Sequence, residues 1–460
     1  MADLRVVIVG AGPAGTRAAE ALVRAGLRPV VIDEGDRSGG QIYRRQPQNF
    51  RRSYAALYGT EAGKAKALHE AFDGLSGHID YRPQTLAWAI CDNRIHIQRA
   101  ETSEALNFDA LIIASGATDR IMPLPGWTRP GCFSLGAAQI SLKAQACAIG
   151  RRVVFMGTGP LLYLVAYQYI KAGAAPLAVL DTTPFSTQIK GLPGMMARPT
   201  QLVKGMRLVG ALLAGGVRIE RGIVPLEIIG DAEGGVTGIR YRNPSGEETR
   251  LACDAVGMGY HLRAESQLAD LAGCRFSFHP TIRQWLPDVD DMGRSSVRNV
   301  YLAGDGVRIL GADGAEASGR LAAFGLLEDQ GLKPSRAEIG RCRKQLRAAR
   351  RFAQGMARAF PWPHQLAQTL ADNTIICRCE VVTAGELRAS VTGKGATEVN
   401  RSKAFSRAGM GRCQGRFCGQ AGQEIVAAAS GLPVESAGRL RGQAPVKPLP
   451  LAIVRGDDDA

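Results

Sequence analysis

Two short runs of apolar, mostly β-branched residues, each followed by a glycine-rich turn, dominate the hydrophobic pattern of the chain. The first run, residues 4–9, has the pattern of a buried parallel strand, and the second covers residues 152–156. After each turn, a segment rich in alanine, leucine or tyrosine predicts a helix that ends near a glycine, Gly26 in one unit and Gly173 in the other. A further apolar run then leads to an acidic residue. The pattern predicts strand, turn, helix and strand, twice.

The first turn has the composition of a dinucleotide-binding turn, and its six residues are Gly10-Ala11-Gly12-Pro13-Ala14-Gly15. Gly10 permits the tight turn, Gly12 lets the backbone approach a pyrophosphate, and Gly15 lets the helix pack close to the strand. The helix N-terminus offers unpaired N–H groups and a positive dipole to the phosphates. The next strand ends at Asp33-Glu34, where the Glu34 carboxylate is placed to bond the ribose hydroxyls. These elements in this order predict a bound dinucleotide.

The second turn, Gly157-Thr158-Gly159-Pro160-Leu161-Leu162, repeats the first at matched spacing. The interval from Gly12 to Glu34 equals the interval from Gly159 to Asp181. Matched spacing over the whole unit predicts two copies of one fold. The candidate residues of the second nucleotide site are Gly157, Gly159, Pro160 and Asp181.

The second copy differs from the first at one informative position. Leu162 stands where the first copy has Gly15, and its bulk obstructs the close approach of helix and strand. Productive binding of NAD(P) in the second copy is therefore disfavoured, although Asp181 remains as a candidate ribose partner. A fold can be retained after its ligand is lost.

Four of the ten cysteines crowd one C-terminal region, as Cys377-Arg-Cys379 and Cys413-x4-Cys418. Four thiolates from two loops are the number that a [2Fe–2S] cluster needs. Glycines beside the second pair let backbone N–H groups point at the sulfurs. Structural zinc is the alternative, although zinc sites favour Cys-x2-Cys spacing. Between the pairs, Thr383 and Glu386 fit a capping box that starts a helix.

The other six cysteines are scattered singly, and we expect buried, unreactive thiols at Cys91, Cys132, Cys147, Cys253, Cys274 and Cys342. His261 has no evident partner in the sequence, which favours a structural histidine over a catalytic one. We find no residue suited to be a dedicated base, so the expected catalytic set of this chain is empty.

The formal charge of +15 could indicate a protein that binds nucleic acid, but the arginines are dispersed along the chain and aromatic residues are few. A basic surface that favours acidic protein partners explains the charge better. No apolar stretch approaches the length of a membrane span, and the N-terminus lacks the pattern of a signal peptide. We therefore expect no nucleic acid, no membrane span and a cytoplasmic location.

Four more motifs in the first 330 residues resemble those of flavoproteins with two dinucleotide-binding domains, typified by thioredoxin reductase. They are Gly39-Gly40-Gln41, the turn Ala114-Ser115-Gly116, Gly304-Asp305, and Gly311-Ala312 at the start of a small-residue helix. The resemblance implies that the first copy binds FAD. The aspartate would meet the ribityl and phosphate region, and the helix N-terminus would face the carbonyl edge of the flavin. The Cys-x-x-Cys pair of those reductases is absent from this sequence.

The cysteine-rich region resembles the bacterioferritin-associated-ferredoxin-like [2Fe–2S] domain. That resemblance implies Cys377, Cys379, Cys413 and Cys418 as the four ligands. An FAD unit followed by this domain is similar to the A or alpha subunits of bacterial opine oxidases, D-hydroxyproline dehydrogenases and hydrogen cyanide synthase. Residues 39–47 and 445–451 look most like the opine and hydroxyproline members.

In that family a separate beta subunit, similar to D-amino-acid oxidases, oxidises the amine. The resemblance implies such a partner, together with an FMN at the subunit interface and a small ferredoxin-like gamma subunit. This chain would then be an electron-transfer subunit in the oxidation of opines or hydroxyproline-like secondary amines. Two alternatives remain, a stand-alone NAD(P)H-dependent reductase and a non-catalytic metal-binding scaffold.

The expected fold class is α/β, with two Rossmann-like domains and a small, mainly helical [2Fe–2S] domain. The FAD domain is discontinuous, because its second fingerprint follows the second copy. The expected parts are 1–120 with 290–330 for FAD, 121–289 for the second copy, 331–370 for a helical linker, 371–430 for the cluster, and 431–460 for an extended tail.

Overall fold

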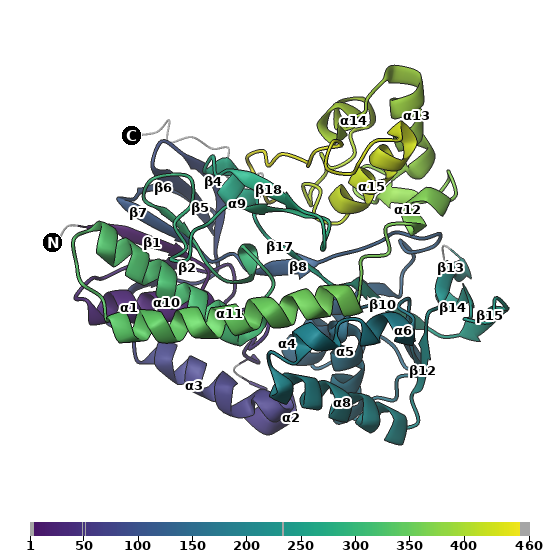
Figure 1. Cartoon of the computed structure of the whole chain (residues 1–460), viewed down its shortest axis with the longest axis horizontal. Helices are drawn as coiled ribbons and strands as arrows, with labels where there is room; N and C mark the ends of the chain where they lie inside the picture. Colours follow the sequence, from purple (N-terminus) through teal and green to yellow (C-terminus); the bar gives the residue numbers. More distant parts are fainter. Residues whose placement is uncertain (1–3, 48, 51, 232–233, 451–460) are drawn as a thin grey trace.

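The computed structural model describes residues 4–47, 49–50, 52–231 and 234–450, and it forms two sheet-centred domains with a third, helical unit (Figure 1). The first sheet is parallel and has the order β20-β7-β1-β2-β3. Its strands are β1 (Val6–Val9), β2 (Val30–Ile32), β3 (Asp80–Arg82), β7 (Ala110–Ile113) and β20 (Val300–Leu302). Because β20 joins from far along the chain, this domain is discontinuous, as expected.

The second sheet repeats the first, with the parallel order β12-β11-β10-β16-β9. Its strands are β9 (Cys132–Ser134), β10 (Val153–Thr158), β11 (Ala178–Asp181), β12 (Arg218–Arg221) and β16 (Ala255–Tyr260). In each sheet the strand before the glycine turn is central, which confirms the predicted fold class of two Rossmann-like domains.

The helices that follow the two glycine turns have equal lengths, α1 (Pro13–Arg24) and α5 (Pro160–Lys171). In the first domain α1 packs along α10 (Gly311–Asp329), and their small and apolar side chains share one core with the sheet. The long helix α11 (Arg336–Ala359) packs on α10 and continues onto the second domain (Figure 1). The predicted basic linker is therefore a rigid helix that spans both domains.

Two antiparallel strands connect the domains, β8 (Ala117–Asp119) and β17 (Leu262–Ala264). The chain after β17 packs against the first domain, since Leu268 and Cys274 share a core with Ile95 and Leu302. The boundary predicted at residue 289 remains a proposal, and this packing favours an earlier one, close to β17.

The remaining elements of the two domains are short hairpins and covering helices. They are α2 (Tyr54–Tyr58), α3 (Ala62–Asp73), β4 (Thr85–Cys91), β5 (Arg94–Arg99), β6 (Thr102–Asn107), α4 (Leu135–Ala144), α6 (Phe185–Ile189), α7 (Leu192–Met195), α8 (Pro199–Ala214), β13 (Val224–Asp231), β14 (Gly235–Arg242), β15 (Glu248–Ala252), α9 (Gln267–Leu271), β18 (Phe276–His279) and β19 (Gln284–Pro287), with 3-10 turns at Gly59–Glu61 and Gly304–Gly306.

The third unit is mainly helical and packs on the second domain, with which it shares a hydrophobic core (Figure 1). Its elements are α12 (Leu366–Thr369), β21 (Ile375–Cys377), β22 (Val382–Thr383), α13 (Ala384–Lys394), α14 (Val399–Ser406) and α15 (Gly419–Ser430). The predicted capping box is confirmed, because Thr383 and Glu386 bond each other's backbone at the start of α13.

The segment after α15 returns to the first domain instead of projecting away from the molecule. Val446 is buried there, and its N–H donates to the Trp88 carbonyl at 3.0 Å. The last ten residues of the predicted tail, 451–460, lie outside the described residues. Among the helices that are described, none combines the length and the apolar character needed to cross a membrane.

Candidate functional site

Three glycine-bearing segments, far apart in the sequence, meet at the first predicted nucleotide site. A Cβ on Gly15 would lie 1.7 Å from the Gly10 carbonyl oxygen, so only glycine fits where α1 crosses the turn. A Cβ on Gly40 would lie 3.0 Å from the Cα of Gly12, and one on Gly304 would lie 2.9 Å from the Cβ of Ala14. The three segments thus form a tightly packed cradle around the start of α1, in which side chains at these positions would crowd their neighbours.

The N-terminus of α1 opens into this cradle without a side-chain cap. Gly12 is the N-cap, Pro13 is the first helical residue, and no acidic side chain lies in the first turn. The first N–H groups of a helix need an acceptor, and a phosphate is a suitable one. The residues present therefore fit the pyrophosphate of FAD.

The two acidic residues after β2 have different roles. Asp33 accepts hydrogen bonds from the N–H groups of Ala11 at 2.5 Å and Gly35 at 2.7 Å, so it braces the glycine turn. Burial raises the pKa of Asp33 above its usual value. The Glu34 side chain is 61% exposed and pairs with Lys447 from the C-terminal segment. Glu34 is thus the acid that faces outward, where the ribose is expected.

The second FAD motif closes the far end of the same site. Asp305 accepts from the N–H groups of Leu310 at 2.8 Å and Gly311 at 3.2 Å, and burial raises its pKa to about 6. Both bonds reach Oδ1, so among the described residues Oδ2 remains for a ribityl hydroxyl. Ala312, at the start of α10, packs against Tyr43 from the loop that follows Gly40. The segments that carry the predicted FAD residues Gly39, Gly40, Gly304 and Ala312 therefore lie close together, and their contact with FAD stays a prediction.

In the second copy, side chains of the protein fill the corresponding space. A Cβ on Gly159 would lie 3.0 Å from Nδ1 of His261, so the imidazole stands directly against the glycine turn. The Nε2 atom of His261 lies 2.5 Å from the carbonyl oxygen of Phe360, and burial lowers the pKa of this histidine to about 4. Leu162 is completely buried. His261 is thus a buried residue bonded to its own fold, in keeping with the structural interpretation, and its ring occupies space beside Gly159.

The sheet register corrects the expectation for Asp181. In the second copy, Gly157 of β10 is paired in the sheet with Asp181 of β11. In the first copy, Val9 is paired with Ile32, so the next residues, Gly10 and Asp33, lie opposite each other. Asp181 accordingly matches Asp33, and Thr182 occupies the place of Glu34. The spacing argument misaligned them because one extra residue lies between α5 and β11.

The contacts of Asp181 fit that new alignment. Its carboxylate is fully buried and accepts from the Thr183 N–H at 2.8 Å and the Tyr163 hydroxyl at 2.7 Å. Gln188 donates a further bond at 3.0 Å. Burial raises the pKa of Asp181 to about 6. This residue stabilises its own domain and has no free oxygen turned toward a ribose.

The four C-terminal cysteines meet between two loops. Cys377 ends β21 and Cys379 follows it, while Cys413 precedes and Cys418 caps α15. The thiol of Cys418 interacts with both Cys377 and Cys413, and Cys379 interacts with Cys413. Cys377 and Cys418 are buried, whereas Cys379 and Cys413 are partly exposed. The fold thus brings together the predicted ligands and leaves one side of the group accessible.

Backbone N–H groups point at the sulfurs, as expected from the glycines. Hydrogen bonds from Cys418 and then from backbone groups, including the N–H of Gly409, lower the pKa of Cys377 to about 6. Cys418 and the N–H groups of Phe417 and Gly415 lower the pKa of Cys413 to about 5. A Cβ on Gly411 would lie 2.3 Å from the Cβ of Cys379, so glycine allows the loops to approach. This donor set stabilises thiolates and fits an iron–sulfur cluster.

A search of the described residues finds no group of three His, Cys, Asp or Glu side chains arranged around a single metal ion. The four cysteines form one connected group, in which Cys418 interacts with Cys377 and Cys413, and Cys413 also interacts with Cys379. A binuclear cluster uses two thiolates for each iron, so four ligands need not converge. Four thiolates with backbone N–H donors beside them fit such a cluster, and the Cys-x-Cys spacing is the argument against zinc.

A hydrogen-bonded link that the sequence did not reveal joins the two candidate sites. The Ser115 hydroxyl donates to the Glu265 carbonyl oxygen at 2.5 Å, in the FAD-site turn. The Glu265 carboxylate accepts two bonds from Arg416, at 2.8 and 3.0 Å, and Arg416 lies between Cys413 and Cys418. Arg416 lowers the pKa of Glu265 against the opposing effect of burial. One buried ion pair thus separates the FAD-site turn from the cluster loop.

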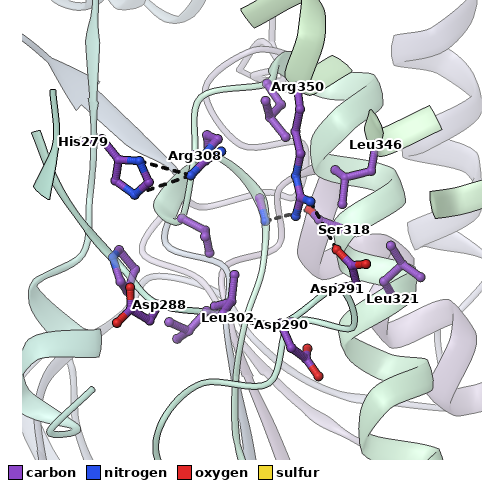
Figure 2. A pocket seen from close by; sticks show the side chains of 16 residues that line it. His279, Asp288, Asp290, Asp291, Leu302, Arg308, Ser318, Leu321, Leu346 and Arg350 are labelled. Carbon is purple, nitrogen blue, oxygen red and sulfur yellow. Dashed lines mark hydrogen bonds and ion pairs between the residues drawn. The ribbon is translucent and has the colours of Figure 1, made fainter. Parts of the chain in front are cut away.

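A cavity of about 260 Å³ lies beside the second FAD motif, lined by loops near β19 and β20 and by α10 and α11 (Figure 2). Arg350 extends toward Asp291, with their charged atoms 3.2 Å apart, and Arg308 extends toward His279. Among the described residues no carboxylate pairs with Arg308. The cavity touches Gly304 and so adjoins the FAD cradle from the α11 side.

The expectation for the scattered cysteines is only partly correct. Three are buried as expected, namely Cys253, Cys274 and Cys342. Cys132 is partly buried, and the prediction is wrong for Cys91 and Cys147, which are exposed. Cys91 ends β4 at a hairpin and Cys147 lies in the loop after α4, positions that no core covers. All ten cysteines are free of disulfides.

Two protein families match the chain. The pyridine nucleotide-disulphide oxidoreductase family matches residues 4–319, and the BFD-like [2Fe-2S] binding domain matches residues 375–428. The two matches cover the predicted FAD and cluster regions. FAD and a [2Fe–2S] cluster are the cofactors that these families imply.

Curated relatives match over nearly the whole chain. The opine oxidase A-subunit of Rhizobium meliloti is 36% identical over 98% of this chain and 88% of its own length. The opine oxidase A-subunit of Agrobacterium tumefaciens is 35% identical, over 97% of this chain and 90% of its own length. Hydrogen cyanide synthase subunit HcnB from Pseudomonas aeruginosa is 30% identical, over 98% of both chains.

Solved structures share the fold. L-proline dehydrogenase from P. horikoshii has a TM-score of 0.70 at 18% identity and covers 98% of this chain and 79% of its own. T. acidophilum thioredoxin reductase has a TM-score of 0.53 at 21% identity, over 71% of this chain and 98% of its own.

Proposed function

Because the chain belongs to the pyridine nucleotide-disulphide oxidoreductase family and carries a BFD-like [2Fe-2S] domain, we propose that it is the electron-transfer subunit of a heteromeric amine dehydrogenase or oxidase. It is an FAD-dependent oxidoreductase. The finer part of the proposal is that the complex acts on opines or hydroxyproline-like secondary amines. The naming of three relatives as subunits of opine oxidase supports this substrate class.

The link through Glu265 and Arg416 carries the proposal. It connects the backbone of the FAD-site turn to the loop that holds Cys413 and Cys418, so hydrogen bonds through a single residue, Glu265, join the two sites. A buried, doubly hydrogen-bonded ion pair keeps its geometry well. A chain that only bound two cofactors, without electron transfer between them, would not need a hydrogen-bonded contact between the two binding sites.

FAD exchanges two electrons and can release them singly, whereas a [2Fe–2S] cluster carries one electron at a time. Oxidation of a secondary amine to an imine releases two electrons and two protons. In the proposal the amine is oxidised on a partner subunit, and the two electrons pass through this chain to a one-electron acceptor. The partly exposed Cys379 and Cys413 mark the side of the cluster from which electrons leave.

The proposed partner is a beta subunit similar to D-amino-acid oxidases, and a small ferredoxin-like gamma subunit completes the complex. An FMN at the interface with the partner is also part of the proposal. The cavity beside Gly304 supports it on this chain, because Arg308 there has no carboxylate partner among the described residues. We also propose a cytoplasmic location, where reducing conditions suit ten free cysteines.

Reduction by NAD(P)H without a partner is a weaker candidate. His261 stands against Gly159 and Asp181 is satisfied by its own domain, so neither the phosphate nor the ribose position is open. A non-catalytic scaffold is also weaker, because it gives the Glu265 link no purpose.

The proposal is tested by preparing the chain without oxygen, alone and together with its candidate partner subunits. We expect extractable FAD, iron with acid-labile sulfide, and a cluster spectrum that changes on adding an opine or hydroxyproline only when the partner is present. Oxidation of these amines by the isolated chain, or absence of both cofactors, would contradict the proposal.

A substitution tests the link itself. Glu265→Gln keeps the size of the side chain but weakens its bonds to Arg416, and we expect slower transfer between flavin and cluster with both cofactors still bound. Stopped-flow spectroscopy follows the two chromophores separately. Glu247→Gln, on an exposed turn, is the control, and equal rates for both variants would remove the role we assign to the link.

A further inference from the structure

Lys143, in the last turn of α4, is an unusual buried cation. Its side chain is 5% exposed, and its Nζ atom donates to the carbonyl oxygen of Ile42 at 3.3 Å. Among the described residues no carboxylate forms an ion pair with it. Burial lowers the pKa of Lys143 to about 8, and Arg44 nearby adds a smaller effect in the same direction. The ammonium group is thus held inside the protein without a compensating charge.

Placing an unpaired charge in the protein interior costs several kcal/mol, so lysine is rarely buried without a partner. The negative end of the α4 dipole offsets only a small part of that cost. Lys171 shows the ordinary arrangement, since it occupies the last turn of α5 in the same domain and is exposed to solvent. Lys143 therefore needs another source of negative charge.

The position of Ile42 indicates what that source is. Two residues before it, Gly40 lies against Gly12 in the phosphate cradle, and one residue after it, Tyr43 belongs to the same small buried cluster as Ala312 at the start of α10. The loop thus runs between the pyrophosphate position and the helix end assigned to the flavin carbonyl edge. Lys143 reaches this loop from α4 of the second domain, so its charge is held where the second domain meets the loop.

We propose that Lys143 faces the isoalloxazine of FAD and supplies a positive charge that favours its reduced, negatively charged form. The inference rests on the proposed function, which gives the chain a bound flavin that is reduced and reoxidised. In this proposal Lys143 acts on the flavin through its charge and forms no bond with the substrate. This role gives the second domain a reason to pack against the loop around Ile42, although its own nucleotide site is proposed to be closed.

Two substitutions separate the charge from the hydrogen bond to Ile42. Lys143→Gln removes the charge and keeps a donor, whereas Lys143→Met removes both. Lys171→Gln, at the matching but exposed helix position, is the control. The measurements are the midpoint potential of the bound flavin, the dissociation constant of oxidised FAD and the thermal unfolding of the holoprotein.

For both Lys143 variants we expect the equilibrium ratio of reduced to oxidised flavin to fall about tenfold at a given potential. That fall is a shift of about 30 mV for a two-electron couple. The dissociation constant of oxidised FAD is expected to stay within about twofold of the original value, because the oxidised ring carries no charge for Lys143 to meet. Lys171→Gln should leave both quantities unchanged.

An unchanged potential in Lys143→Gln would overturn the proposal, even if Lys143→Met fails to fold. Equal weakening of oxidised and reduced FAD binding would do so as well, because it would assign the lysine to the pyrophosphate. These results differ from a failure of the proposed function, which would appear as amine oxidation by the isolated chain or as absence of both cofactors.

Discussion

The two dinucleotide-binding copies have the same topology and differ in what occupies the glycine turn. In the first copy α1 begins without a side-chain cap, and the residues that approach the turn from distant segments are glycines, Gly40 and Gly304. In the second copy α5 begins in the same way, but the His261 ring lies against Gly159. The fold alone therefore does not make a nucleotide site. The side chains that approach the turn decide whether a phosphate can enter.

The acidic residues that follow the second strand of each copy also differ between the two copies. Asp33 and Asp181 both accept the N–H group two residues further on, so both stabilise their own loop. Only the first copy has a second, exposed acid beside it, Glu34. The second copy keeps the acid that stabilises the loop and lacks the acid that we propose to contact the ribose.

Gly15→Leu gives the first copy the residue of the second, and it should have the largest effect. A side chain there would overlap the Gly10 carbonyl oxygen, so we expect loss of bound flavin and destabilisation of more than about 4 kcal/mol. Flavin content and thermal unfolding measure the effect. Gly63→Leu, at an exposed position of α3 with no atom within 4 Å of its Cβ, is the control. Retention of full flavin in Gly15→Leu would contradict the cradle.

Asp181→Asn tests the claim that the second acid is structural, and the cost should depend on pH. Because burial raises the pKa of Asp181 to about 6, its protonated form stabilises the folded state below the unfolded pKa. That contribution is lost as the pH rises through 6. The cost of the substitution should therefore be greatest near pH 4 and smaller above pH 6, by up to about 3 kcal/mol. Denaturant unfolding at several pH values measures it. A cost that rises with pH, or a change in FAD affinity, would be evidence against this role.

Glu34→Gln tests the ligand-facing acid of the first copy. We expect FAD to bind about tenfold more weakly, about 1.4 kcal/mol, with little change in stability, because an exposed side chain loses one charge-assisted hydrogen bond. Fluorescence titration measures the affinity. Lys447→Met removes the ion partner of Glu34 and is the control. If Lys447→Met weakens FAD equally, the tail rather than the ribose contact explains the effect.

The smallest effect is expected from NADH or NADPH added to the isolated chain without oxygen. Since the phosphate position beside Gly159 is closed, the flavin absorbance should not change at millimolar concentrations. Dithionite, which needs no binding site, is the positive control for reducible flavin. Rapid bleaching by either nucleotide would mean that the second copy opens in solution.

The sequence predicted the fold class, both Rossmann-like copies and the meeting of the four cysteines. It also predicted the capping box at Thr383. These features depend on local spacing, since a strand, a tight turn and a helix constrain which residue types follow one another. The same spacing misaligned Asp181 with Glu34, because one residue inserted before a strand is visible only in the sheet register. The burial of Cys91 and Cys147 was predicted wrongly for a related reason, as isolated residues carry no pattern.

By itself, the sequence of this protein determined where its glycine turns and thiolate loops occur, because those motifs are contiguous and their chemistry is local. Only the tertiary structure decided that His261 closes the second site, that Glu265 meets Arg416, and that Lys143 is buried against the FAD loop. Each of these contacts joins segments far apart in the chain. They depend on how domains pack, and no spacing within one segment encodes that.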